Sequence, residues 1–556
     1  MKKIFKTRKI FFLLLVMVIM SFLGCKKNFL DRPPLDRLSS SQTFSDKALT
    51  EAYLANLYST FPAGFTMYDG GSGGGAGVSS DNGLMMTSNF SDEARNKSDW
   101  ISSNTTVVPG LYSATDDPLD FWERAYRAIR IANNIIMNIK TSPYDEAYKQ
   151  RIESDARFIR ATFYFFLARS YGDVPLITEA QPIDNLEGLL VKQTPQLDVY
   201  NFIDTELGEI GQILPSASNL PPNELGRATR EAAWALNGRV LLYAKNYTKS
   251  AEFSKKVMDA NVFTLSADYG QLFKSYGGNP EVIFEVLYNG AEKGHSFDVY
   301  NIPVGWELDY ASQMDPTQEM VDAYQMTNGL SITDPGSGYD PNDPYKNRDS
   351  RLKATIFYQG SPPFKGRALD MVLPDGEQAP LRMYLCSITG YYIRKFLDET
   401  GTVIPTYSKS KTSWKELRLG EVLLNYAEAQ NEAGGPDQTV YAAINAVRAR
   451  AQIADLPVGL SQVEMRQRII QERRVELAFE NVRWYDLIRW KMSKTVLNDK
   501  YFNGMFITRN GSGGLVYTRT LVNTRPKQYF LDRNYLLPIP QSEIEKNPNL
   551  KQNTGY

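Results

Sequence analysis

The side chains that most often carry out catalysis are scarce in this chain of 556 residues. His295 is the only histidine, so a metal site built from several histidines is excluded, and a Ser/His/Asp triad would depend on this one residue. Cys25 and Cys386 are the only cysteines. We interpret His295 as a structural loop residue and Cys386 as an inert buried thiol. We expect no catalytic residues, no cofactor and no metal.

Aromatic side chains are abundant instead, at 12% of the residues, and several stand in polar loops. An aromatic ring can pack against the C–H face of a ligand while neighbouring polar groups take its hydrogen bonds. For each ring the alternative is ordinary burial in the core. The candidate ligand-binding residues are Trp100 with its neighbours Asp92, Arg95 and Asn96, then Trp306 and Tyr310, and finally Tyr68.

The amino terminus has the pattern of an export signal. Residues 1–9 contain five basic residues and no acid, and an apolar run follows over residues 10–23, before Gly24 and Cys25. This run is shorter than the roughly 20 residues that a membrane span needs. Leu23-Gly24-Cys25 resembles a bacterial lipobox, so we expect cleavage after residue 24 and lipidation of Cys25, with residues 25–42 as a tether. An ordinary secreted protein with an incidental cysteine is the alternative.

Charge argues against a nucleic-acid partner. The formal net charge is −1, and removing the basic leader makes the remainder more acidic. We find no basic stripe in the sequence that would follow a phosphate backbone.

The first half is predicted to be helical. Ser45 is a candidate cap for a helix over residues 46–58, and the glycine-rich residues 64–77 are expected to form a flexible surface loop. A helix that is apolar nearly all round should end at Gly172. Thr194 and Pro195 are expected to begin the next helix, and Thr229 the one after it. Residues 230–244 and 247–258 then form a hairpin of tetratricopeptide (TPR) style.

The rest of the chain divides into two parts. Residues 261–416 alternate short apolar runs with long loops, which are often functional. Residues 417–556 return to helices, including one that Ser461 and Glu464 open with a capping box and that is expected to run over residues 463–490. We assign the charged residues of 472–489 to paired contacts within the scaffold. Together with residues 43–260, these parts are predicted to form a single domain.

Motifs along the whole chain resemble the SusD/RagB family. In the first half they are KNFLDRPPLDRLSS at residues 27–40, ARFIRA at 156–161, YGDVPLI at 171–177 and GRAT at 226–229. In the second half they are PTQEMV at 316–321, NRDSRL at 347–352, LRLGEVLLNYAEA at 417–429, ERRVELAFE at 472–480, RWYDLIRW at 483–490, LPIP at 537–540 and QNTGY at 552–556.

The resemblance implies a mainly α fold, in which TPR-like hairpins form a superhelical scaffold packed against a loop-rich, irregular half. It implies a surface-exposed lipoprotein of the outer membrane that captures oligosaccharide or polysaccharide. The glycan would pass to a SusC-like TonB-dependent transporter, without catalysis. The family's ligand residues lie in variable loops, so the seven candidates above depend on local composition and not on a shared motif.

Three alternatives stay open. RagB-like relatives serve peptide uptake, and an acidic or basic groove in place of an aromatic platform would favour a peptide ligand. A surface hydrolase would need a cleft with two carboxyl groups roughly 5 to 9.5 Å apart. The acidic residues of 334–343 leave a structural calcium open, although they lack the spacing of an EF-hand loop.

Overall fold

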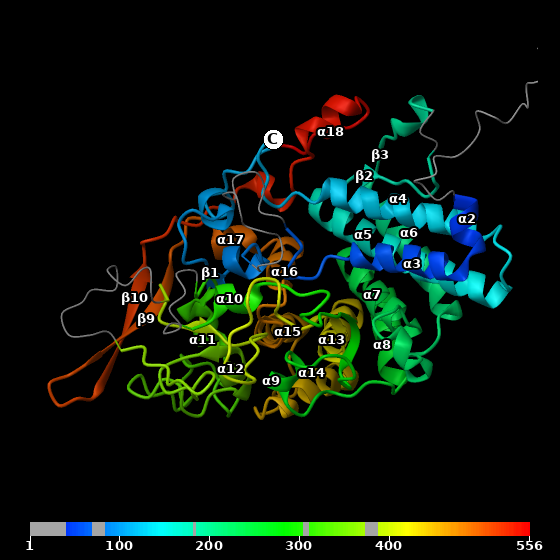
Figure 1. Ribbon diagram of the computed structural model, residues 1–556. Coiled ribbons are helices and arrows are strands. Elements are labelled where there is room, and N and C mark those ends of the chain that lie inside the picture. The colour runs from blue at the N-terminus through cyan, green and yellow to red at the C-terminus, as the bar shows by residue number, and fades with distance from the viewer. Residues whose placement is uncertain (1–39, 69–83, 182–184, 304–310, 373–386) are drawn as a thin grey trace, which may run out of the picture.

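The structure, a computed structural model, describes residues 40–68, 84–181, 185–303, 311–372 and 387–556 (Figure 1). Four residues discussed above, Cys25, Trp306, Tyr310 and Cys386, lie outside these ranges.

Stacked helices form the right-hand side of the molecule in Figure 1. Helix α3 packs on α5, and each helix from α4 to α8 contacts the next one in the chain. This arrangement confirms the predicted helical hairpins. The helices are α2 (Ser40–Ser45), α3 (Lys47–Ser59), α4 (Trp122–Ile139), α5 (Glu146–Tyr171), α6 (Gln196–Ile213), α7 (Arg230–Tyr243) and α8 (Tyr247–Asp259).

The composition of these helices explains their packing. Helix α5 buries its aromatic rings on every side, as a helix between several neighbours must, and Gly172 ends it with φ of 77°. In the α7–α8 hairpin, a Cβ at Gly238 would lie 2.7 Å from the Ser254 hydroxyl oxygen. The absence of a side chain at residue 238 therefore sets how closely the two helices approach.

A second helical group follows in the carboxyl-terminal part, and α13 packs against α7, α8, α14 and α15. The two helical groups therefore form one scaffold. The second group contains α13 (Leu419–Gly434), α14 (Gln438–Arg450), α15 (Gln462–Glu476), α16 (Arg483–Arg489), α17 (Ser493–Leu497) and α18 (Gln541–Lys546).

The left-hand side of Figure 1 is rich in loops and carries short helices and two-stranded sheets. The longest sheet is the β9–β10 hairpin, which projects from this side. The short helices are α9 (Tyr269–Leu272), α10 (Phe297–Asn301), α11 (Gln318–Ala323) and α12 (Ser350–Thr355). The paired strands of the described chain are β1 (Ala94–Arg95) with β5 (Asp315–Pro316), β2 (Val174–Pro175) with β3 (Gln193–Thr194), β4 (Val282–Val286) with β8 (Trp414–Arg418), β6 (Ile356–Phe357) with β7 (Tyr392–Ile393), and β9 (Phe502–Arg509) with β10 (Leu515–Val522). Of these, the β2–β3 pair lies on the right-hand side of Figure 1, with the stacked helices.

Of four predicted helix N-caps, Ser45 and Thr194 were wrong, and Thr229 and Ser461 were right. Asp46, not Ser45, caps α3, because its carboxylate accepts from the Leu49 N–H. Thr194 belongs to strand β3, and the first N–H of α6 is bound instead by the carboxylate of Asp173 at 2.8 Å. Thr229 caps α7 as predicted.

The helix predicted over residues 463–490 is two helices. The Ser461–Glu464 capping box opens α15 as expected, but the helix ends at Glu476. Phe479 and Asn481 then take positive φ angles of 63° and 58°, which break the helical path before α16.

The predicted surface loop over residues 64–77 was wrong for its described part, because residues 64–68 are mostly buried. A Cβ at Gly64 would lie 2.2 Å from the Trp414 ring, so this glycine lets the backbone pack flat on the indole.

The charged residues of α15 form a buried ion-pair network, which confirms their assignment to the scaffold. The Glu476 carboxylate binds Arg351 at 2.8 Å, Arg418 at 2.6 Å and Arg450 at 2.5 Å. These arginines come from α12, β8 and α14. The network therefore ties the loop-rich side to the helical scaffold.

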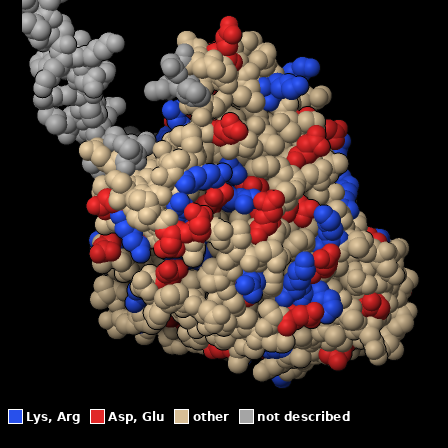
Figure 2. Space-filling view, turned by 90° about the vertical axis from the view of Figure 1, so that its right-hand side faces the viewer, with Lys and Arg blue, Asp and Glu red and all other residues tan. Residues whose placement is uncertain are grey.

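The surface charges are mixed in sign. Figure 2 shows the face formed by the stacked helices, where acidic and basic side chains are interspersed. None of the described helices combines the length and the apolar composition that a membrane crossing requires.

Candidate functional site

Trp100 is an exposed ring on a well-braced turn. Its side chain and backbone are 40% exposed. The Asn104 side-chain amide donates to the carbonyls of Asn96 at 2.8 Å and Ser98 at 2.7 Å, and the Asn96 side-chain oxygen accepts from the Ser98 N–H at 2.9 Å. The chain on either side of Trp100 is thus fixed by short hydrogen bonds. A ligand can reach the ring without a rearrangement of this turn.

The predicted neighbours of Trp100 lie in the interior. Asp92 binds Arg483 at 2.8 Å and Arg474 at 2.9 Å. Burial alone would raise the pKa of Asp92, but these two guanidinium groups more than offset it and hold the pKa well below its usual range. Arg95 lies 3.9 Å from the centre of the Phe502 ring, and burial lowers the pKa of Arg95 to about 9. Both residues therefore support the turn from within.

Tyr68 and Asn96 are buried as well. The Tyr68 hydroxyl shares a hydrogen bond with the Tyr485 hydroxyl, between the amino-terminal helices and α16. Asn96 belongs to the turn described above. For these two residues, as for Asp92 and Arg95, a contact with ligand stays a prediction. The same holds for Trp306 and Tyr310, which lie outside the described residues.

Two further exposed rings lie on chain segments that are connected to the Trp100 turn. Tyr529 is 40% exposed and Tyr501 is 37% exposed. The Tyr529 N–H donates to the Val108 carbonyl at 2.8 Å, which places this tyrosine beside the segment that follows Trp100. Our sequence analysis did not find either residue. Residues 526–530 read Pro-Lys-Gln-Tyr-Phe, which has no polar–apolar alternation, so the sequence carried no local signal for Tyr529.

His295 lies in the aromatic core. Its ring stacks on Phe65 with 4.3 Å between the ring centres. One ring nitrogen, Nδ1, accepts from the Phe297 N–H at 3.2 Å, and the other, Nε2, then donates to the Thr412 carbonyl at 2.9 Å. These contacts give the histidine a packing role.

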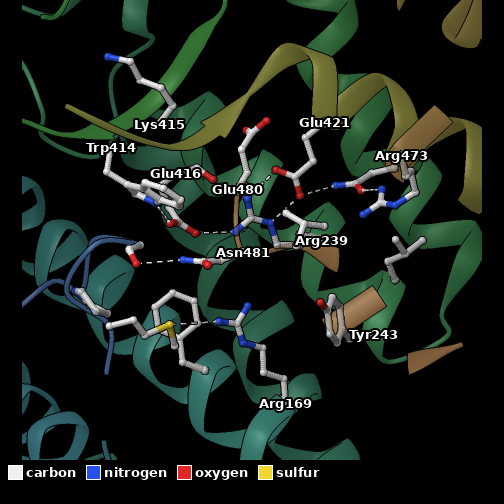
Figure 3. Close-up of a pocket in the computed structure, with 17 residues that line it drawn as sticks. Arg169, Arg239, Tyr243, Trp414, Lys415, Glu416, Glu421, Arg473, Glu480 and Asn481 are labelled. Atoms are coloured by element: carbon white, nitrogen blue, oxygen red, sulfur yellow. Dashed lines mark hydrogen bonds and ion pairs between the residues drawn. The ribbon is translucent and has the colours of Figure 1, made fainter. Parts of the chain in front are cut away.

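A small, partly open pocket lies between the two helical groups (Figure 3). Its volume is about 40 Å³, which holds a few water molecules at most. The Arg239 guanidinium lies between two carboxylates, binding Glu416 at 2.6 Å and Glu421 at 2.5 Å. Burial would raise the pKa of Glu421, but Arg239 holds it below its usual value. Both carboxylates are thus paired with the same guanidinium, which suits them to the scaffold.

Comparison with known proteins identifies the family to which this chain belongs. The sequence profile of the SusD family matches residues 280–556. A second profile, described as "Starch-binding associating with outer membrane", matches residues 28–242. The chain belongs to the SusD/RagB family.

Individual relatives of this SusD/RagB protein are distant in sequence but similar in structure. SusD-like protein P2 of Formosa agariphila is 27% identical over 463 residues, covering 78% of this chain and 80% of the relative. A solved SusD-like protein of Bacteroides fragilis is 28% identical with a TM-score of 0.77, covering 94% of this chain and all of that one. A solved SusD-like carbohydrate binding protein of the same species is 27% identical with a TM-score of 0.76, and the match covers 92% of this chain and 100% of that one. The predicted fold and family are confirmed.

The largest cavity of this SusD/RagB chain that we describe is a groove of about 750 Å³ between α4, residues 175–191 and α18. Its lining includes leucines of the 186–190 segment and aromatic rings of α4, together with the cations Arg127, Arg130 and Lys546. Arg127 is paired with Glu123 at 2.6 Å, and Lys546 is paired with Glu543 at 2.7 Å. The groove therefore combines apolar side chains with charged side chains of both signs.

Proposed function

We propose that this chain is a non-enzymatic carbohydrate-binding lipoprotein of the outer-membrane surface, and that Trp100 contacts the glycan. The observation that carries the proposal is the exposed indole on a fixed turn, in a chain that aligns over nearly its whole length with a SusD-like carbohydrate binding protein. An indole face packs against the C–H groups of a sugar ring, which is the contact that such a ligand needs.

Capture without catalysis fits the electrostatics of the small pocket. Glu416 and Glu421 are paired with Arg239, and Glu480 is paired with Lys395 and Arg418. A glycosidase needs instead one carboxyl group that holds a proton at working pH. The proposal includes delivery of the glycan to a SusC-like TonB-dependent transporter, supported by family membership. Lipidation of Cys25 would keep the protein at the membrane.

The proposal is tested with a soluble chain that begins after Cys25. A glycan array followed by calorimetric titration of each hit should find a carbohydrate ligand that remains chemically unchanged after prolonged incubation. Trp100→Ala should weaken binding roughly tenfold, because it removes the stacking face. Tyr276→Ala is the matched control, since Tyr276 is also exposed, at 55%, but lies elsewhere on the surface, near Leu225.

Other results would count against the proposal. Binding to a peptide library in the absence of any glycan hit would favour the peptide alternative, and conversion of a bound glycan would show an enzyme. Labelling with radioactive palmitate in cells should mark the unaltered chain and not Cys25→Ala. Co-purification with a TonB-dependent transporter tests the partner.

A further inference from the structure

Strand β10 is the open edge of the hairpin that projects from the loop-rich side (Figure 1). The other strand, β9, is covered along its outer edge, where the Met505 N–H donates to the Thr389 carbonyl at 2.8 Å and Ile507 bridges to Val372. In the described chain, β10 pairs with no strand except β9. The hairpin therefore has one covered edge and one edge that no described strand covers.

The hydrogen-bond pattern of the hairpin shows which backbone groups lie on this edge. At the tip, the Asn510 N–H donates to the Gly514 carbonyl at 2.9 Å, and β9 pairs with β10 without a register shift. Residues of an antiparallel pair bind each other at every second position. Met505, which is opposite Arg519, turns its N–H away from β10, which agrees with this pattern. The residues of β10 whose N–H and carbonyl groups point away from β9 are therefore Leu515, Tyr517, Arg519 and Leu521.

Within the described chain, these outward groups have almost no partners. Only the Leu521 carbonyl is bound there, by the Asn523 N–H at 3.2 Å. An open strand edge is a template for pairing with another chain, and proteins usually block it with lysine, proline or a bulge. The eight residues of β10, LVYTRTLV, contain none of these, and Val516 and Leu521 are exposed at 40% and 48%. Strand β10 is therefore an unprotected edge rich in strand-forming residues.

We propose that two copies of this chain pair through β10, antiparallel and about a two-fold axis at Thr518, to form one four-stranded sheet. An axis perpendicular to the sheet keeps each side chain on its own face, so odd-numbered residues pair with odd-numbered ones. With the axis at Thr518, Tyr517 is opposite Arg519 of the second copy, and Leu515 is opposite Leu521 of the second copy, so all four outward residues are bound. An axis at Arg519 would place two guanidinium groups opposite each other, which is unfavourable.

The side chains agree with this register. Leu521, which is half-exposed in the single chain, gains an apolar neighbour in Leu515 of the second copy, and the Tyr517 ring lies beside a guanidinium. Two threonines meet on the axis, which is a favourable pair between strands. The hairpin tip of the second copy would lie beside Asn523 and Thr524, which are exposed. The edge is therefore complementary to a second copy of itself in backbone groups and in side chains.

The contact is small, because two strands bury less than the roughly 1,600 Å² of a standard interface. Pairing of the soluble chain should therefore be weak, and a cross-link is needed to trap it. Lipid anchoring, which belongs to the proposed function, would concentrate copies on one membrane and favour the pair. The pairing itself does not depend on which ligand the chain binds.

Single-cysteine variants of the soluble chain test the register, each made together with Cys386→Ser. Two Thr518→Cys copies would have their Cα atoms about 4.5 Å apart, as in a non-hydrogen-bonded pair, so they should form a disulfide-linked dimer under mild oxidation. Thr520→Cys is the matched control, because two copies of residue 520 are about 13 Å apart along the strands, beyond the roughly 7 Å limit of a disulfide. A mixture of Thr520→Cys with Val516→Cys should cross-link again, because these residues are opposite each other.

Sedimentation equilibrium at increasing concentration measures the pairing without a cross-link. The apparent mass of the soluble chain should rise towards twice that of the monomer. Tyr517→Pro should abolish this rise, because it removes an outward N–H that β9 does not use. Tyr517→Ala keeps that N–H and should retain the rise. Circular dichroism confirms that each variant keeps its fold.

Two results would overturn the pairing. One is a Thr518→Cys chain that cross-links no faster than Thr520→Cys, and the other is an unaltered chain that stays monomeric at every concentration, as Tyr517→Pro should. Because Trp100 is not part of the paired strands, either result leaves the proposed function standing. A glycan titration that fails likewise leaves the pairing standing.

Discussion

At the scale of single residues, Glu93 shows how burial changes a carboxyl group that supports the Trp100 segment. It precedes strand β1, and its carboxylate accepts from the Ser88 hydroxyl at 2.8 Å and the Phe479 N–H at 3.0 Å. No ion pair of Glu93 is found among the described residues. Burial raises the pKa of Glu93 to about 7, although both hydrogen bonds oppose the shift.

This raised pKa predicts that stability decreases with pH. Below its usual pKa of 4.5, Glu93 is protonated in both the folded and the unfolded state, so its contribution to the free energy of unfolding is fully present there. This contribution is lost as the pH rises through 7. The loss for one such group is about 3 kcal/mol. Glu93→Gln should remove this part of the decrease, as measured by urea unfolding between pH 4.5 and 8.

Asp315 provides the internal comparison, because burial raises its pKa to about 7 as well. Asp315→Asn should remove a similar part of the decrease in the free energy of unfolding between pH 4.5 and 8. The double variant should remove both parts. If the free energy of unfolding of Glu93→Gln decreases with pH as steeply as that of the unaltered chain, Glu93 is ionised at neutral pH in the folded chain.

The residue scale also shows what sequence can predict about the site. Trp100 stands in a run of polar residues, and the structure places it on the surface at 40% exposure, although its contact with a ligand stays a prediction. Asp92 and Arg95 look equally polar in the sequence, but their partners Arg483 and Phe502 are hundreds of residues away. Tyr529 lies beside the Trp100 segment only because its N–H binds the Val108 carbonyl and its neighbour Gln528 pairs with Lys500. Such pairings are tertiary and leave no local signal.

At the scale of elements, the network around Glu476 fixes how α15 meets its neighbours. Burial would raise the pKa of Glu476, but Arg450, Arg418 and Arg351 hold it far below its usual range. Its contribution to stability is therefore present above pH 4.5 and is lost as the pH falls. Glu476→Gln should destabilise the protein by about 3–5 kcal/mol at pH 7, because three buried guanidinium groups lose their shared counter-charge.

Chemical unfolding at pH 7 measures this loss. Asp259→Asn is the control, since the Lys255–Asp259 ion pair is exposed on α8 and its removal should cause no measurable change. Equal stability of Glu476→Gln and the unaltered chain would show that the network adds no net stability.

The ends of elements were predicted unevenly, for physical reasons. Gly172 and the Ser461–Glu464 box are local signals, and both were placed correctly. The break after Glu476 has no glycine or proline near it, and Phe479 adopts positive φ within a fully buried setting. Tertiary packing imposes this conformation against the local preference, so periodicity alone predicted one continuous helix.

At the scale of the whole molecule, the hydrophobic core connects both ends of the chain. One continuous cluster includes residues from Phe44, just before α3, to Leu550, near the carboxyl terminus. A second cluster joins Leu242 and Ala251 of the α7–α8 hairpin to α13, α14 and α15. The division into residues 43–260, 261–416 and 417–556 follows composition, but both clusters cross its boundaries.

We therefore expect one cooperative unit. Calorimetry of the soluble chain should give a single unfolding transition, with a calorimetric enthalpy close to the van't Hoff value. Residues 43–260 expressed alone should lack a sharp transition, because the face of α8 that packs on α13 would be exposed to water. Mixing this fragment with residues 261–556 should restore native-like unfolding if the pieces can reassociate before they aggregate. A fragment 43–260 that is monomeric and melts sharply by itself would show instead that the amino-terminal helices form an independent domain, and that the shared clusters join two units that are already folded.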